Sequence, residues 1–231
     1  MSSTNQTLHV CVEGAIGVGK STFLLGIKPF LEKEPGFKNT TFTWLPEPVA
    51  EWKSYGRNKV NLLKLMYDLP EDFSFEFQIA ALSSKIRQLK QFANRSKLTE
   101  RSILAQLKVF VPVLRENEAI SDLQLELLEE MCEIGLEIPY MNPDIYIYLY
   151  AEPEVVFDRI KSRGRIEEKN ITLFYLQQLH EKYEQWMWSE EMINKCIVVD
   201  MNKKGHVDLD FEKISQQIER HNQLYIPKLL L

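Results

Sequence analysis

The chain has 231 residues, of which 45% are apolar, and a formal net charge of −5. This size and apolar content favour one α/β domain over residues 1–231 rather than two small domains. The negative charge argues against a nucleic acid or an anionic membrane as a partner held by bulk electrostatics. The polar start has no secretory or transit pattern, and no apolar run approaches ~20 residues, so we expect a soluble, cytoplasmic protein. Three scattered cysteines predict neither a disulfide framework nor a zinc site.

The first expected strand, residues 8–13, leads into a loop that reads G-x-x-x-x-G-K-S, which is the phosphate-binding pattern. Its glycines allow the backbone to approach a polyphosphate, and successive N–H groups form an anion nest at the start of the next helix. Lys20 supplies a charge for the β- and γ-phosphates, and the Ser21 hydroxyl can ligate Mg²⁺. A chance match to a Gly-rich turn is the alternative, and the flanking strand and helix disfavour it. The residues predicted to bind ATP here are Gly14, Ala15, Ile16, Gly17, Val18, Gly19, Lys20, Ser21 and Thr22.

Strand and helix patterns alternate along the rest of the chain, which predicts a five-stranded parallel sheet with helices on both faces. The further strands are expected at 40–45, 97–100, 143–150 and 196–200. The helices are expected at 20–33, 49–55, 61–66, 72–92, 103–116 with a bend at Pro112, 121–135, from Pro153 onward, 172–189 and 208–223.

Polar residues follow two of these strands directly. Glu47 comes after the second strand and is held between two prolines, and Glu100, Arg101 and Ser102 close the third. Ligands bind at the carboxyl edge of a parallel sheet, so these side chains are candidates for a site. A surface Glu and a simple Glu100–Arg101 ion pair are the alternatives. The basic run that begins at Arg159 can likewise be a solvated helix face.

Taken in order, these motifs resemble the deoxyribonucleoside kinases of the deoxycytidine, deoxyguanosine and multisubstrate or thymidine type. The matching stretches are 13–23, 47–52, 61–87, 100–102 and 159–168, with a weaker match through 175–186. The resemblance covers about residues 8–200. It implies a P-loop kinase with an Arg-rich lid at about 159–170 and a homodimer. It also implies transfer of the γ-phosphoryl group of ATP, with Mg²⁺, to the 5′-hydroxyl of a deoxynucleoside.

The resemblance gives roles to the polar residues. Glu47 is the expected general base, and Arg101 holds that carboxylate or the 5′-oxygen. Glu100 assists Mg²⁺ through water, together with Ser21. The catalytic set is expected to be Glu47, Arg101, Lys20, Arg163 and Arg165, and the arginines that close on the phosphoryl group are Arg159, Arg163 and Arg165. Arginine suits this task because its planar fork pairs bidentately with phosphate oxygens.

The same resemblance implies a nucleoside pocket. Glu168 and Tyr67 are expected to hold the sugar 3′-hydroxyl, Gln78 to read the base edge, and Phe77 and Phe110 to stack on the base. Aromatic residues at helical spacing are more often core, and this applies most to Phe110. The other residues expected to line the pocket are Ile16, Trp52, Leu63, Met66, Lys85 and Gln106.

The sequence departs from the family where base choice is decided. Deoxycytidine and deoxyguanosine kinases usually have an Arg–Asp pair beyond the base-reading Gln, whereas this chain has Lys85 and Gln106. Pyrimidines such as thymidine or deoxycytidine are the favoured substrates. A thymidylate-type monophosphate kinase is the alternative enzyme, but Glu47 would repel an acceptor phosphate. A non-catalytic P-loop binding module is the alternative of another class, although D-x-x-G and N/T-K-x-D motifs are missing.

Overall fold

The computed structural model describes residues 7–203 and 209–225. Within them, five strands form one parallel sheet in the order β2-β3-β1-β4-β5, as predicted. The central strands β1, β3 and β4 are short and almost entirely buried, which is typical of a sheet covered on both faces. The strands are β1 His9–Glu13, β2 Thr43–Leu45, β3 Lys97–Glu100, β4 Ile145–Tyr150 and β5 Cys196–Asp200.

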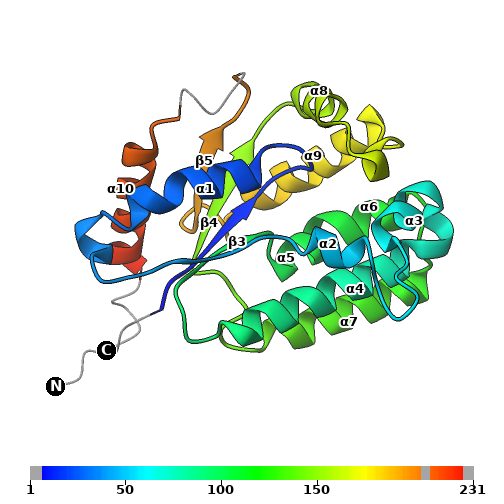
Figure 1. Ribbon diagram of the computed structural model, residues 1–231, viewed down its shortest axis with the longest axis horizontal. Coiled ribbons are helices and arrows are strands. Elements are labelled where there is room, and N and C mark those ends of the chain that lie inside the picture. The colour runs from blue at the N-terminus through cyan, green and yellow to red at the C-terminus, as the bar shows by residue number, and fades with distance from the viewer. Residues whose placement is uncertain (1–6, 204–208, 226–231) are drawn as a thin grey trace.

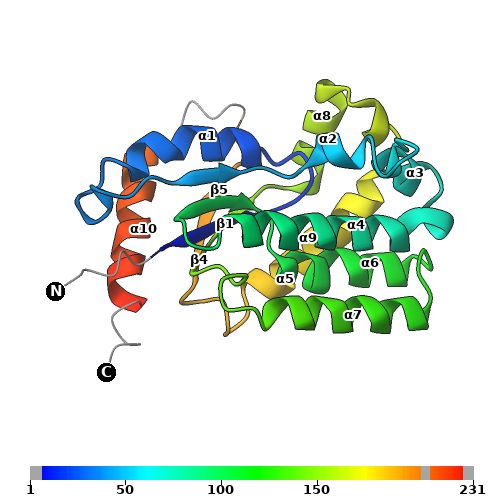
Figure 2. The ribbon, with the colours of Figure 1, turned by 60° about the horizontal axis from the view of Figure 1, so that its bottom comes forward.

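Helices cover both faces of this sheet. Helices α1 and α10 pack together on one face, and α5, α6 and α9 lie on the other (Figures 1 and 2). Helices α4 and α7 lie side by side in both views. The helices are α1 Lys20–Leu31, α2 Val49–Trp52, α3 Leu62–Asp68, α4 Pro70–Gln91, α5 Ile103–Ala105, α6 Val111–Glu116, α7 Asp122–Leu136, α8 Pro153–Arg163, α9 Leu173–Met187 and α10 Phe211–Tyr225, with short 3₁₀ turns at Pro35–Phe37 and Ile166–Glu168. None of the described helices is long and apolar enough to cross a membrane.

Several predicted boundaries move, each for a local reason. The second strand begins at Thr43, because that residue is the first to pair with β3. Helix α4 begins two residues earlier than predicted, at Pro70, because proline suits the first turn of a helix. Helix α7 begins at Asp122 rather than at residue 121, because Ser121 is its N-cap and forms a complete capping box with Gln124. The last helix begins at Phe211, and its predicted first residue, Asp208, lies outside the described residues.

The prediction of one helix over 103–116 is confirmed, with a change of hydrogen-bond pattern inside it. A π-helical segment, Gln106–Phe110, lies between α5 and α6, and the backbone stays right-handed helical on both sides of it. Pro112 follows this segment directly, where its missing N–H is accommodated by the change of pattern. Such π-helical turns are frequent at functional sites, and this one carries two residues of the predicted pocket.

The strand order creates the crevice in which a ligand can bind. The chain runs from β1 outward to β2 and β3 on one side, and then to β4 and β5 on the other. Loops that follow neighbouring strands therefore diverge beside β1. The loop after β1 needs its glycines, because Gly14 and Gly17 have φ of 134° and 83°. A Cβ on Gly17 would lie 2.6 Å from Ile160 of α8, so the phosphate-binding loop packs directly against that helix.

Candidate active site

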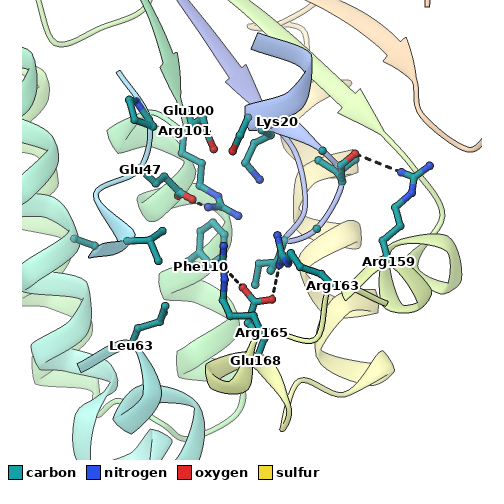
Figure 3. A pocket seen from close by; sticks show the side chains of 18 of the residues that line it. Lys20, Glu47, Leu63, Glu100, Arg101, Phe110, Arg159, Arg163, Arg165 and Glu168 are labelled. Atoms are coloured by element: carbon teal, nitrogen blue, oxygen red, sulfur yellow. Dashed lines mark hydrogen bonds and ion pairs between the residues drawn. The ribbon is translucent and has the colours of Figure 1, made fainter. Parts of the chain in front are cut away.

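A cavity of about 590 Å³ opens at the carboxyl edge of the sheet (Figure 3). Apart from Gly14 and Ala15, which form the back of the loop, all residues predicted for the site line this cavity. The lining residues from the loop and the sheet edge are Ile16, Gly17, Val18, Gly19, Lys20, Ser21, Thr22, Glu47, Glu100 and Arg101. Those from the helices and the arginine segment, residues 159–170, are Trp52, Leu63, Met66, Tyr67, Phe77, Gln78, Lys85, Gln106, Phe110, Arg159, Arg163, Arg165 and Glu168.

Lys20 is held inside the phosphate-binding loop. Its Nζ donates to the carbonyl oxygens of Gly14 and Ala15 at 3.0 and 2.9 Å. Burial, with the nearby charge of Arg101, lowers the pKa of Lys20 to about 7. Helix α1 begins here without a side-chain cap, so the free N–H groups of its first turn point at the cavity. The loop thus offers a cation and backbone donors to one anionic ligand.

Glu47 and Arg101 form an ion pair on the opposite wall (Figure 3). Burial opposes the ionisation of Glu47, but Arg101 and Lys20 outweigh it and hold the pKa of Glu47 below its ordinary value. The Arg101 guanidinium also lies over the Phe110 ring, 4.8 Å from its centroid. Because Arg101 pairs with Glu47, the alternative of a simple Glu100–Arg101 pair is wrong.

Glu100 leaves a carboxylate oxygen without a partner. The residue is 3% exposed, and its Oε1 has no hydrogen bond. Burial and the charge of Glu47 raise the pKa of Glu100. No group of three acidic, His or Cys ligands occurs in the described parts of the chain. One carboxylate and the Ser21 hydroxyl nevertheless fit Mg²⁺, which retains waters and binds largely through substrate phosphates.

The arginine segment contacts both walls. Arg159 donates to the carbonyl oxygens of Met201 and Lys203 at 2.6 and 2.9 Å, and to that of Val18 at 3.3 Å. It therefore joins the phosphate-binding loop to the loop after β5.

Farther along, Arg163 and Arg165 both pair with the buried carboxylate of Glu168 (Figure 3). The neighbouring Glu167 accepts from Asn61 at 3.0 Å and pairs with Lys53 at 3.0 Å, which ties the segment to the α2–α3 side.

The two residues that depart from the family bond to backbone rather than to each other. Lys85 Nζ donates to the Glu100 carbonyl at 2.7 Å, and Gln106 Nε2 donates to the Gln78 carbonyl at 2.6 Å. Gln78 and Lys85 both lie on α4 and both line the cavity, as predicted. Aromatic residues line the same part of the cavity: the rings of Trp52 and Phe77 meet edge to face, with their centroids 5.3 Å apart.

Sequence reasoning missed part of the wall. The residues not predicted are Pro46, Val49, Ala81, Tyr175, Asp200, Met201, Lys203 and Leu209. Four of them, Asp200, Met201, Lys203 and Leu209, lie at or after the carboxyl end of β5. That end reaches the same sheet edge as the phosphate-binding loop. The rule that ligands bind at the carboxyl ends of parallel strands was a signal that could have found them.

A phosphate-binding loop and a carboxylate–guanidinium pair facing one cavity define a P-loop phosphotransferase. A family profile described as "Deoxynucleoside kinase" matches residues 10–223. The chain belongs to the deoxynucleoside kinase family, whose members are ATP-dependent phosphotransferases.

Three relatives illustrate the range of the family. The deoxycytidine kinase of Homo sapiens is 31% identical over 207 residues, which are 77% of this chain and 74% of that protein. The mitochondrial deoxyguanosine kinase of Xenopus laevis is 29% identical over 79% of this chain and 74% of its own length. The thymidine kinase of Ictalurid herpesvirus 1 (strain Auburn) is 30% identical over 95% of this chain and 90% of its own length.

Proposed function

We propose that this enzyme transfers the γ-phosphoryl group of ATP to the 5′-hydroxyl of a pyrimidine deoxynucleoside for nucleotide salvage. The observation that carries the proposal is the Glu47–Arg101 pair across the cavity from Lys20. A carboxylate beside the acceptor favours a hydroxyl nucleophile and disfavours a second phosphate. The thymidylate-type alternative is therefore the weaker of the two.

In this proposal Glu47 orients the 5′-hydroxyl and accepts its proton. The transition state is loose, so orientation contributes more than proton abstraction. Arg101 keeps Glu47 ionised and fixed. Ser21, and Glu100 through water, would hold Mg²⁺, which would supply positive charge against the phosphates when bound.

The arginines of residues 159–170 act as a lid in the same proposal. Arg163 and Arg165 exchange part of their contact with Glu168 for the oxygens of the transferring group. Glu168 is then free to accept from the 3′-hydroxyl of the sugar beside Tyr67. Gln78 pairs with the base edge between the rings of Phe77 and Phe110.

The preference for pyrimidines rests on two features. Lys85 and Gln106 already donate to backbone carbonyls, so neither offers the fixed Arg–Asp pair that is usual beyond the base-reading Gln in deoxycytidine and deoxyguanosine kinases, which favours thymidine between the two pyrimidines. The herpesvirus thymidine kinase also aligns over more of this chain than the deoxycytidine and deoxyguanosine kinases do.

The test is a kcat/KM panel over thymidine, deoxycytidine, deoxyadenosine and deoxyguanosine with ATP·Mg²⁺, with dTMP as a further acceptor. We expect a pyrimidine nucleoside to lead. A purine ahead by more than tenfold contradicts the base preference, and turnover of dTMP alone supports the monophosphate kinase. Nucleotide binding without transfer to any acceptor supports the non-catalytic module.

We also propose a homodimer built on α7. This helix exposes an apolar stripe, in which the exposed fractions are 66% for Leu123, 41% for Leu127, 39% for Met131 and 57% for Ile134. The stripe follows helical spacing, as a helix packing on a second copy requires. Light scattering after chromatography tests this: Ile134→Glu is expected to give monomers, whereas Leu25→Glu, at an exposed apolar site on α1, is expected to keep the dimer.

The free thiols of Cys11, Cys132 and Cys196 suit the reducing cytoplasm in which we propose that the enzyme works.

A further inference from the structure

Glu13 is a buried carboxylate that the proposed mechanism leaves without a role. It is the last residue of β1, lies directly before the phosphate-binding loop, and is 0% exposed. Its Oε1 accepts from the backbone N–H and the hydroxyl of Ser102 at 2.8 and 2.7 Å. Its Oε2 accepts from the Tyr183 hydroxyl at 3.3 Å. The Cys11 thiol donates to the same Oε1 at 3.5 Å, so four donors converge on this fully buried carboxylate and offset the cost of burying it.

Ser102, which provides two of these donors, directly follows a residue with a strained backbone. Arg101, the residue before Ser102, has φ of 56°, in the left-handed region. This conformation is unfavourable for any residue other than glycine, and it persists only where the surroundings enforce it. Here the peptide groups on both sides of Arg101 are held. Lys85 donates to the Glu100 carbonyl at 2.7 Å on one side, and Glu13 accepts from the Ser102 N–H on the other.

The turn decides where the Arg101 guanidinium points. The Arg101 N–H donates to the Val12 carbonyl at 3.0 Å, so the residue is also fixed to β1. A change of φ to the ordinary negative region would rotate the Cα–Cβ bond and carry the guanidinium away from Glu47. Glu13 therefore acts on the Glu47–Arg101 pair through backbone, without touching either side chain in a hydrogen bond.

We infer that Glu13 is a positioning residue for phosphoryl transfer: by holding Ser102 it keeps Arg101 in the left-handed turn that presents the guanidinium to Glu47. The inference rests on the roles proposed above for Glu47 and Arg101. Because Glu13 also precedes Gly14 directly, one carboxylate aligns the acceptor pair with the start of the phosphate-binding loop.

The experiment compares Glu13→Ala and Glu13→Gln with the wild-type enzyme. A displacement of about 1 Å at a catalytic group can cost ~100-fold, so we expect kcat to fall by about 100-fold in Glu13→Ala. We expect kcat to fall by about tenfold in Glu13→Gln, because the amide keeps one acceptor oxygen. KM for ATP is expected to change less than twofold. Glu34→Gln is the matched control, because Glu34 is another buried acid bonded to a serine hydroxyl, that of Ser215, and does not line the cavity.

The pH profile separates positioning from charge and from stability. The acidic limb of kcat/KM reports Glu47 and Glu100 in the free enzyme; Arg101 and Lys20 lower the pKa of both carboxyls, and Lys85 lowers that of Glu47. Loss of the Arg101 contact raises the pKa of Glu47 and moves the limb to higher pH. Mere loss of the Glu13 charge moves it to lower pH. A purely structural role lowers the amount of active enzyme and leaves the limb in place.

Each outcome then decides one question. A limb shifted upward with reduced kcat in both variants supports the inference. An unshifted or downward-shifted limb, or a kcat as high as that of Glu34→Gln, overturns it while wild-type activity stands. If Glu13→Ala does not fold, Glu13→Gln carries the test. A wild-type enzyme that phosphorylates no deoxynucleoside overturns the proposed function instead.

Discussion

Strands β1 and β3 bury charged side chains at both of their ends, and the two ends use them differently. At the amino end, His9 Nε2 bonds to Thr99 Oγ1 at 2.9 Å, and the His9 N–H donates to Asp144 at 2.7 Å. Lys97 is 2% exposed and directs its Nζ at three backbone carbonyls, at 3.3 to 3.5 Å. The hydrogen bonds of His9 and Lys97 hold the neighbouring loops against the sheet.

At the carboxyl end the charges pair with one another and still leave bonding capacity. Glu100 Oε1 and the Arg101 Nε and Nη2 atoms are buried without a partner beside the cavity. Burial of charge is thus common to both ends, and unused donors and acceptors next to a cavity distinguish the site. Among His9, Thr99, Asp144 and Lys97 at the amino end, only the His9 Nδ1 atom is buried without a hydrogen-bond partner. His9 lines neither of the described cavities.

The largest expected effect tests the carboxyl end directly. Glu47→Gln keeps the shape of the side chain but removes the charge that faces Arg101, so we expect kcat to fall by ~10²- to 10⁴-fold. ATP affinity, measured by calorimetry, is expected to stay the same because Lys20 and the loop are untouched. Glu51→Gln, on the same helix–turn region but outside the cavity, is the control. Near-full turnover in Glu47→Gln would remove this residue from the proposed role.

A smaller effect sharpens the assignment of Glu168. We expect Glu168→Gln to raise KM for the deoxynucleoside by about tenfold, since a charged hydrogen bond is worth ~1.5–3 kcal/mol and the amide retains part of it. The decisive readout uses a 2′,3′-dideoxynucleoside. In the wild type, loss of the 3′-hydroxyl should lower kcat/KM, whereas in Glu168→Gln the two substrates should converge. An unchanged ratio contradicts contact with the 3′-hydroxyl.

The smallest effect belongs to the amino end and concerns stability alone. Burial lowers the pKa of His9 well below its ordinary value, and the charges of Lys97 and Lys85 act in the same direction. The unfolded chain therefore binds a proton that the folded chain does not, and stability falls as pH drops below ~6.5. Between pH 7.5 and 5.5 this amounts to about 1 kcal/mol.

Urea unfolding at both pH values measures this term. We expect His9→Gln to show a flatter pH dependence of the free energy of unfolding than the wild type. The measurements are kept above pH ~5 because burial raises the pKa of Asp144. At lower pH the folded chain therefore binds a proton at Asp144 more readily than the unfolded chain, which opposes the effect of His9 on stability. A steep slope retained in His9→Gln would mean that another group dominates.

The contrast between the two ends also explains what sequence could predict. The phosphate-binding loop, Glu47 between its prolines, and Glu100–Arg101 after β3 are local patterns whose meeting point follows from parallel strands. The left-handed turn at Arg101, the backbone bonds of Lys85 and the burial of Glu13 depend on contacts between distant segments, which no local spacing encodes. The π-helical turn before Pro112 was missed because its sequence is compatible with an ordinary helix.

The attachment of residues 159–170 to both walls has a consequence for substrate binding. Arg159 holds the phosphate-binding loop and the loop after β5, while Glu167 holds Lys53 after α2 and Asn61 before α3. A ligand that shifts one attachment changes the free energy of the other, and linkage makes that effect reciprocal. ATP and the deoxynucleoside should therefore each alter the other's affinity by the same factor, so that this short segment couples two sites that share no ligand.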